Sequence, residues 1–333
     1  MKKAILLVNI GTPDSPDCAD VRKFLAAYLN DPRVIVLPRI RRTLLVKGVI
    51  VPFRMRKSAT AYRKLWEGCD DSPLRFYLEL TRRKLQEQLG DSVDVWAAVR
   101  YGNPSLSAVI NAMSRQGYKQ WTVIPLFPQY TSSTTGSIED GVREQARKFG
   151  LPQPRIVQQF WFHPAFLKVW QQRLTAHHPE NYDMVVFTFH GLPLSHLPKA
   201  CRTNCTCSPY RGEADYFSLP QRCYKADCHD FAAKIAALCG LDEHRYVVTF
   251  QSRISGRWLQ PYTDRVLKDL AEKRLKTLVA TPSFVSDCLE TRVELDMEYR
   301  QLFVAGDEQE YRRVEALNDR QEWIDALAEI CKM

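Results

Sequence analysis

Two groups of residues in this chain have the types and spacing to carry out chemistry, and the first combines a histidine with carboxylates. His190 follows the apolar run at 185–189. Four acids follow a second apolar run that ends at Ala280: Asp287, Glu290, Glu294 and Glu298. Successive acids are three, four and four residues apart, so a helix would place them on one face. A neutral imidazole near such a row of carboxylates can bind a divalent metal ion and transfer protons.

Each of these features alone also has an ordinary structural explanation. A lone histidine at a strand end is more often a hydrogen-bonded structural residue, and an acidic helix face is often simply solvated. Here, however, only Arg292 interrupts the acids, whereas an exposed helix usually interleaves lysines with them. No second histidine lies three to five residues from His190, so we expect no closed zinc site. A loosely held metal suits a metal ion that is a substrate.

The second group is a cysteine-rich loop at 201–228. It contains half of the chain's ten cysteines: Cys201, Cys205, Cys207, Cys223 and Cys228. Clustered thiolates in a cytosolic protein select zinc or an iron–sulfur cluster. The first pair lacks the C-x2-C spacing of common zinc ribbons, so we expect a [2Fe-2S] cluster first and structural zinc second. Four ligands are needed, and the loop offers five.

The elements that position these groups alternate between strands and helices. Short apolar runs predict strands at 4–10, 93–99, 121–127, 155–160, 184–189, 246–250 and 277–280. Helical periodicity predicts helices at 20–29, 74–89, 106–116, 138–149, 231–238, 263–273 and 318–332. This alternation is typical of α/β proteins with doubly wound parallel sheets. Polar residues follow many of the strands, where ligands bind in such sheets, and we therefore expect two α/β halves with a cleft between them.

Length and charge restrict the class of protein. A chain of 333 residues exceeds a typical single core, so two domains are expected. The net charge of +9 comes with no recognised nucleic-acid motif, so we expect no nucleic-acid partner. Cations are concentrated only at 39–57, around an apolar stretch. This segment is either a core helix with solvated ends or an amphipathic lip that rests on a membrane surface.

The sequence also indicates the compartment. It contains no run of 18 apolar residues and no cleavage site after its first residues, so we expect neither a transmembrane helix nor a signal peptide. Unevenly spaced cysteines do not resemble a secreted disulfide framework. We therefore expect a cytoplasmic protein.

Ordered motifs along nearly the whole chain identify a family resemblance. They are LVNIGTP at 7–13, SPL at 72–74, RYGNP at 100–104, FPQYTSSTTGS at 127–137, VVFTFHGLP at 185–193, FQSRISGRWLQPYT at 250–263 and PSFVSDCLETRVELDMEY at 282–299. Together they closely resemble ferrochelatase, a lyase that inserts Fe2+ into a porphyrin in the last steps of haem synthesis. The resemblance implies two Rossmann-like halves around a porphyrin cleft, with no nucleotide.

The resemblance also implies roles for individual residues. His190 would be the catalytic histidine that takes pyrrole protons or ligates the iron, and Glu290 would be the facing glutamate. The acidic path for metal or protons would comprise Asp287, Glu294 and Glu298. The macrocycle would be lined by Arg100, Tyr101, Tyr62, Tyr130, Gln251, Ser252, Trp258 and Phe284, with Ile10 after the first strand. The basic and apolar stretch would be the hydrophobic lip through which the porphyrin enters, which favours contact with a membrane surface.

The chain departs from the family pattern at two positions. Cys288 stands where many relatives have a histidine, and some bacterial members also have cysteine there. Ile10 stands where some members that use coproporphyrin have a tyrosine, which favours protoporphyrin IX as the substrate. Some bacterial members carry an internal [2Fe-2S] cluster in the cysteine-rich region. Cys228 matches a cysteine of members without that loop, so the first four cysteines are the expected ligands and Cys228 the alternate.

These interpretations fix the expected organisation. Residues 1–150 would form the N-terminal half with the lip at 39–57, and 151–310 the C-terminal half with the histidine, the cysteine loop and the acidic helix. Residues 311–333 would form a helical extension. The alternatives are a related chelatase that uses Co2+, Ni2+ or coproporphyrin III, and a haem or metal sensor without turnover.

Overall fold

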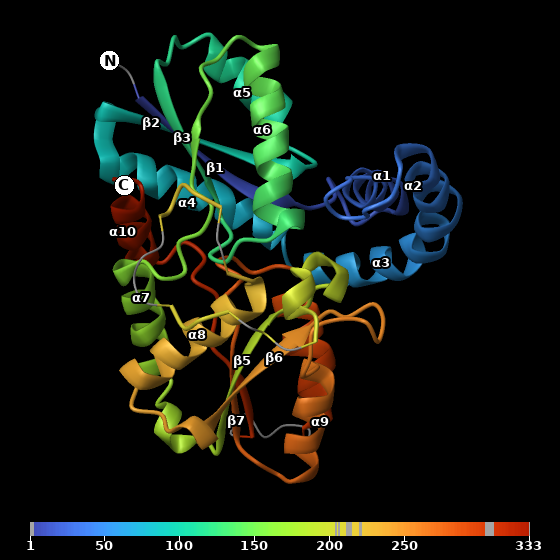
Figure 1. Cartoon of the computed structure of the whole chain (residues 1–333), viewed down its shortest axis with the longest axis vertical. Coiled ribbons are helices and arrows are strands. Elements are labelled where there is room, and N and C mark those ends of the chain that lie inside the picture. Colours follow the sequence, from blue (N-terminus) through green and yellow to red (C-terminus); the bar gives the residue numbers. More distant parts are fainter. Residues whose placement is uncertain are drawn as a thin grey trace. The chain divides into compact units, whose positions relative to one another are not determined.

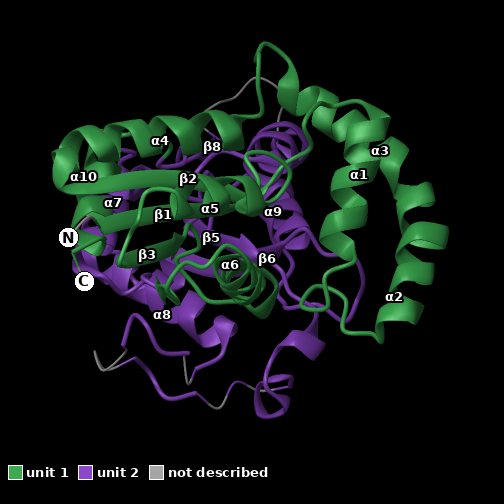
Figure 2. Cartoon of the chain, turned by 90° about the horizontal axis from the view of Figure 1, so that it is seen from above, with its two compact units in different colours: residues 1–158, 318–333 green, residues 159–317 purple. Residues whose placement is uncertain are grey.

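The chain divides into two compact units in the computed structural model, which describes residues 3–203, 205, 207–210, 215–219, 222–303 and 310–332. Unit 1 comprises Met1–Gln158 and Asn318–Met333, and unit 2 comprises Gln159–Leu317. Figure 2 colours the two units separately. Each unit is built around its own sheet and is described by itself.

Each unit contains a four-stranded parallel sheet. The strands of unit 1 are β1 (Lys3–Gly11), β2 (Val93–Tyr101), β3 (Gln120–Pro125) and β4 (Arg155–Ile156), in the order β2-β1-β3-β4. The strands of unit 2 are β5 (Met184–His190), β6 (Tyr246–Gln251), β7 (Thr277–Ala280) and β8 (Tyr311–Arg313), in the order β6-β5-β7-β8. Both orders reverse direction at the central strand, as in doubly wound folds. The predicted α/β class is confirmed.

The strand sequences explain which strands are central. The residues at 4–9 of β1 and 185–189 of β5 are all buried, and the runs are nearly continuous in apolar residues. Strands covered on both faces have this composition. β4 is shorter than the predicted strand at 155–160, and it pairs with β3 in the first sheet. This differs from the sequence interpretation, which grouped that strand with the second half.

The helices of unit 1 cover its sheet and extend beyond it. They are α1 (Cys18–Leu29), α2 (Arg39–Leu45), α3 (Val51–Trp66), α4 (Pro73–Leu89), α5 (Leu106–Ser114), α6 (Ser137–Lys148) and α10 (Gln321–Ile330), with π-helical segments η1 (Val46–Ile50) and η3 (Ser132–Gly136). Apolar residues of α5 and α6 pack with those of β1 into one core cluster. α10 packs beside α4 (Figures 1 and 2). α1, α2 and α3 lie beyond one end of the sheet of unit 1 (Figure 2).

The helices of unit 2 flank the second sheet. They are α7 (Pro164–Thr175), α8 (Tyr224–Leu238) and α9 (Thr263–Glu272), and a ten-residue π-helix, η8 (Glu290–Tyr299), follows β7. α8 and α9 lie on opposite sides of the sheet (Figure 1). Short 3-10 helices occur in unit 2 at Pro179–Asn181, Leu194–His196, Lys199–Cys201, Glu243–Arg245 and Arg300–Leu302, and in unit 1 at Gly90–Ser92. Because β5, β6 and β7 are parallel neighbours, the loops that follow them meet at one edge of the sheet, where doubly wound folds bind ligands.

Candidate active site and metal centre

His190 is the last residue of β5, and its ring has a defined orientation. Its Nδ1 lies 2.6 Å from the carbonyl oxygen of Gly191. A carbonyl oxygen only accepts hydrogen bonds, so Nδ1 carries a proton, and in the neutral ring Nε2 keeps its lone pair. The imidazole is half-buried. In this tautomer Nε2 can accept a proton or bind a metal ion.

The backbone around His190 is held by two neighbours. The Gly191 N–H donates to the carbonyl oxygen of Gln251 at 2.8 Å, which extends the pairing of β5 with β6. A Cβ at Gly191 would lie 2.7 Å from that same oxygen, so the close approach requires glycine. The hydroxyl of Tyr224 donates to the carbonyl oxygen of His190 at 3.0 Å. Tyr224 was not predicted from the sequence, because its position after Cys223 does not by itself indicate a contact with His190.

Two aromatic side chains from neighbouring loops flank the histidine. The ring centroid of His190 lies 6.5 Å from that of Trp258 and 6.3 Å from that of Phe284. Trp258 is fixed by an isolated antiparallel bridge to Pro193, and Phe284 follows β7. The structure therefore brings together the predicted histidine and two of the predicted aromatic residues, all within unit 2.

Three of the four predicted acids lie in the π-helix η8. They are Glu290, Glu294 and Glu298, of which the first two are half-buried and the third is exposed. Hydrogen bonds from residue i to i+5 widen a helix, so residues four apart lie more nearly above one another than in an α-helix. The expected helical row of acids is therefore present, in a wider helix than the spacing predicted.

Glu294 is the most firmly held of these acids. Its carboxylate accepts hydrogen bonds from the backbone N–H and the hydroxyl of Ser252, at 2.9 and 2.5 Å, and from the Gln251 side chain at 3.2 Å. It also accepts one from the hydroxyl of Tyr299 at 2.5 Å. Burial and the neighbouring Glu294 charge raise the pKa of Tyr299, so this phenol keeps its proton and remains a donor. Gln251 also donates to the backbone oxygen of Glu290 at 3.3 Å, which connects the end of β6 to the start of η8.

Asp287 differs from the other acids because it lies before η8 and is almost fully buried. Its carboxylate pairs with Arg313 at 3.1 Å and accepts a hydrogen bond from Thr291 at 2.9 Å. Arg313 also pairs with Asp296 at 2.7 Å. The buried ion pair of Asp287 with Arg313 connects the start of η8 to β8. Asp287 therefore lies outside the row of acids in η8 and has a different set of partners.

In unit 1, the predicted residues Arg100 and Tyr101 form a network around a residue that was not predicted. Asp31 is nearly buried and accepts hydrogen bonds from Arg100 at 2.9 Å, from the Tyr101 hydroxyl at 2.7 Å and from Ser137 at 2.8 Å. Arg100 also donates to Ser137 at 2.9 Å. Burial alone would raise the pKa of Asp31, but the backbone N–H of Arg33, these hydroxyls and the charge of Arg100 outweigh it and lower the pKa. Asp31 therefore stays ionised and fixes the side chains at the end of β2.

The remaining predicted lining residues of unit 1 differ in exposure. Tyr62 is buried on α3, with edge contacts to the rings of Phe24 and Trp66. Tyr130 and Ile10 are half-buried, after β3 and near the end of β1. Tyr62 therefore acts in the packing of α3, whereas the other two present part of their surface.

Four of the five cysteines of the loop come together in unit 2. The sulfur atoms of Cys201, Cys205, Cys207 and Cys223 all lie within 4.8 Å of one another, and they form the cysteine cluster. The closest pairs are Cys201 with Cys207 at 3.6 Å and Cys205 with Cys223 at 3.3 Å. Cys228 is fully buried in α8 and is not part of the group. The donor set of four thiol sulfurs is that of zinc and iron–sulfur sites.

The segment at 39–57 is helical but is not a core helix. Along it, α2, η1 and α3 follow one another without a break. Several large apolar side chains point into solvent, with Ile40 76%, Leu44 68% and Phe53 82% exposed. Cations flank them: Arg39, Arg41, Lys47, Arg54, Arg56 and Lys57. This exposure argues against the core-helix alternative from the sequence.

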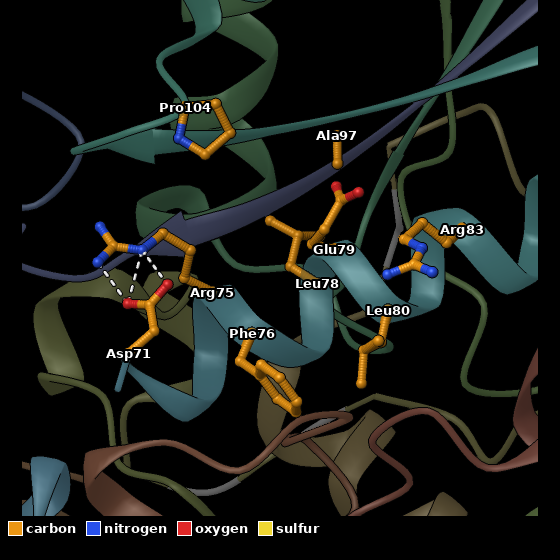
Figure 3. A pocket seen from close by; sticks show the side chains of 9 residues that line it. All are labelled: Asp71, Arg75, Phe76, Leu78, Glu79, Leu80, Arg83, Ala97 and Pro104. Atoms are coloured by element: carbon orange, nitrogen blue, oxygen red, sulfur yellow. Dashed lines mark hydrogen bonds and ion pairs between the residues drawn. The ribbon is translucent and has the colours of Figure 1, made fainter. Parts of the chain in front are cut away.

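Unit 1 also has a pocket that contains none of the predicted residues. It has a volume of about 440 Å³ and is lined by residues of α4 with Ala97 of β2 and Pro104 (Figure 3). Arg75 and Asp71 form an ion pair at its rim.

None of the described helices combines the length and apolar character needed to cross a membrane.

Comparison with known proteins agrees with the motifs over the full chain. A family model described as Ferrochelatase matches residues 2–333. A protein named Ferrochelatase from Herminiimonas arsenicoxydans is 37% identical over 340 residues, covering 100% of this chain and 86% of that protein. A protein of the same name from Coxiella burnetii (strain CbuG_Q212) is 34% identical over 343 residues, covering 99% of this chain and 93% of that protein.

Solved structures with a similar fold are more distant in sequence. The sirohydrochlorin chelatase SirB from Bacillus subtilis subspecies spizizenii, in complex with cobalt, aligns with a TM-score of 0.54 at 12% identity and covers 100% of this chain and 94% of that one. SirB from Bacillus subtilis with Fe3+ aligns with a TM-score of 0.53 at 11% identity, over 99% of this chain and 94% of that one. At these identities the likeness concerns the fold.

Proposed function

The chain belongs to the ferrochelatase family, and on that premise we propose which of its residues carry out the reaction. The protein is a lyase that inserts Fe2+ into a porphyrin in haem biosynthesis. Metalation must remove two pyrrole protons and bring the ring nitrogens and the ion together. The proposal therefore has to identify a proton acceptor, a route for the metal and protons, and groups that orient the ring.

We propose that the Nε2 atom of His190 accepts a pyrrole proton. The observation that carries this assignment is the hydrogen bond from Nδ1 to the Gly191 carbonyl, which fixes the tautomer with a basic Nε2. Trp258 and Phe284 lie beside the imidazole and offer apolar faces to a flat macrocycle. Binding energy from the rest of the ring can favour the bent geometry that metalation needs.

We propose that Glu290, Glu294 and Glu298 form the path by which Fe2+ or protons reach the histidine. Their burial increases along the helix towards its first residue and supports this direction, because Glu298 is exposed while Glu294 and Glu290 are half-buried. Asp287 acts differently in this proposal, since its ion pair with Arg313 stabilises the start of η8. Gln251 and Ser252 hold Glu294, and so connect the path to the end of β6.

The substrate we propose is protoporphyrin IX. Ile10 supports this choice because, by the family resemblance, an apolar side chain stands where some members that use coproporphyrin have a tyrosine. The specificity constants for Fe2+ insertion into protoporphyrin IX and coproporphyrin III should differ in favour of the former. A preference for coproporphyrin III, or for Co2+ or Ni2+ over Fe2+, would refute the proposed substrates.

We propose that the cysteine cluster holds a [2Fe-2S] cluster through Cys201, Cys205, Cys207 and Cys223. Its support is the gathering of four soft sulfur ligands in one place, and structural zinc is the second candidate. Such a group would supply iron–sulfur bonds that cross-link the loop, together with one-electron redox chemistry. Protein purified without oxygen should contain about two irons and two sulfides per chain. One zinc per chain instead would refute the assignment.

We propose that the lip at 39–57 rests on the surface of a membrane. Its support is the row of exposed apolar side chains with flanking cations, the pattern of helices that lie in the interface of an anionic bilayer. An apolar porphyrin could then enter from the lipid.

The role of His190 is tested by chemical rescue. His190→Ala should nearly abolish turnover, and added imidazole should restore part of it if Nε2 acts as a base. A variant with unchanged turnover would refute the assignment.

A further inference from the structure

Tyr224 lies between the two chemical groups of unit 2, the candidate active site and the cysteine cluster. We propose that Tyr224 is a positioning residue for His190 and links the histidine to the cysteine cluster. The inference rests on the proposed role of His190, and its test below separates the two.

The first contact is with the histidine itself. The hydroxyl of Tyr224 donates to the carbonyl oxygen of His190 at 3.0 Å. The tyrosine side chain is only 7% exposed, so the hydrogen bond is shielded from competing water.

This hydrogen bond completes the fixation of one peptide unit. The peptide bond between His190 and Gly191 has its C=O held by Tyr224 and its N–H held by the Gln251 carbonyl at 2.8 Å. In a trans peptide the C=O and N–H groups lie in the plane and point in opposite directions, so both edges of this peptide unit are held by hydrogen bonds. The Gly191 carbonyl that orients the imidazole lies one residue further on, and its direction depends on this peptide plane.

The second contact is with the cysteine cluster. Tyr224 is the first residue of α8, and Cys223 is its N-cap, with Sγ accepting from the Ala226 N–H at 3.4 Å. The backbone N–H of Cys223 donates to the sulfur of Cys207 at 3.3 Å. Since Cys223 and Cys207 both belong to the cysteine cluster, a group bound there fixes the point at which α8 begins. It thereby fixes the position of Tyr224.

The two contacts form one path through consecutive residues. Cys223 starts α8, and Tyr224 holds the peptide that carries the imidazole; a metal centre in the cysteine cluster would hold Cys223 in place. Loss of such a centre, or loss of the hydroxyl, would free the same carbonyl and let the ring leave the orientation in which Nε2 faces a pyrrole proton. A sub-ångström shift of a reacting group is enough to slow proton transfer.

The test compares wild-type protein with Tyr224→Phe, each with its bound metal and after removal of the metal by a chelator. The imidazoles are observed by NMR through ¹³C at Cε1, where the seven histidines give up to seven signals and His190→Ala identifies the one of interest. Tyr246→Phe is the matched control. Tyr246 begins β6, at the end of the strand opposite Gln251, and its ring packs on Phe187. Metal content and thermal unfolding show that each variant is folded and loaded.

We expect Tyr224→Phe to shift the His190 signal, and to lower kcat about tenfold with an unchanged KM for porphyrin. Removing the metal from the wild type should produce the same shift, and removing it from Tyr224→Phe should add nothing. A His190 signal that is unaffected by Tyr224→Phe, or that still moves on metal removal in this variant, would overturn the link. An active His190→Ala would refute the base assignment instead, whatever the NMR result.

Discussion

Replacement of Gly191 by alanine tests the close approach of β5 and β6 at the candidate active site. The added Cβ would lie 2.7 Å from the carbonyl oxygen of Gln251 and 3.4 Å from the Trp258 ring. Real Cβ atoms essentially never approach within 3.0 Å, so the strand ends must separate by at least about 0.3 Å. That shift would lengthen the 2.8 Å hydrogen bond from the Gly191 N–H to Gln251 to about 3.1 Å, near the long end of the normal range.

The energetic cost follows from these displacements. A weakened buried hydrogen bond costs about 1 kcal/mol, and overpacking costs about 1–3 kcal/mol, so the free energy of unfolding should fall by about 2–4 kcal/mol. Because the imidazole is held by the Gly191 carbonyl, the same shift should lower kcat about tenfold or more. Both quantities are measured on one preparation, the first by urea unfolding and the second by anaerobic metalation kinetics.

Gly256→Ala is the matched control for this prediction. Gly256 is also in unit 2, has no positive φ and has no atom within 4 Å of an added Cβ. This variant should remain within about 0.5 kcal/mol of the wild type and keep its kcat. If Gly191→Ala behaves in the same way as Gly256→Ala, the packing argument at the end of β5 is wrong.

Three further perturbations test other parts of the account. Asp31→Asn should lower the free energy of unfolding by about 3 kcal/mol at pH 7. Because the folded pKa of Asp31 is lowered, its contribution is complete above the unfolded pKa of about 3.9 and is lost as the pH falls through the folded pKa. Urea unfolding curves of the variant and the wild type should therefore converge in strong acid. Cys205→Ser should lose the bound metal and Cys228→Ser should keep it, as elemental analysis of the purified variants will show; equal loss from both would contradict the four-cysteine assignment. Phe53→Asp should weaken binding to anionic vesicles at least tenfold in a sedimentation assay, since burying one such ring contributes about 2 kcal/mol, and unchanged binding would remove the lip from the membrane surface.

Much of the fold could be predicted from the sequence because its signals are local. The apolar runs of β1 and β5 and the helical periodicity of α4 and α9 place each of these elements within about two residues. The strand β8 was not predicted, since its three residues, Tyr311–Arg313, include two arginines and offer no apolar run. Its pairing with β7 comes from tertiary context.

The candidate site was predictable only in part, for a related reason. Residue types identified His190, the acids of η8 and the five cysteines of the loop, because these side chains bind metals or transfer protons. The choice of the four cysteines that gather came from the family resemblance. Asp31 and Tyr224 were missed, because each is a common residue whose function depends on partners 70 and 34 positions away in the chain. The π-helical form of η8 was also unforeseen, since a four-residue spacing does not distinguish it from an α-helix.

The most direct test of the central claim is the initial rate of Fe2+ insertion into protoporphyrin IX, measured without oxygen on the 333-residue chain. Wild-type protein should form haem with turnover, and His190→Ala should fall to nearly the uncatalysed rate while it remains folded. His178→Ala, at an exposed histidine, should retain the wild-type rate. Haem formation by His190→Ala at the wild-type rate would contradict the account.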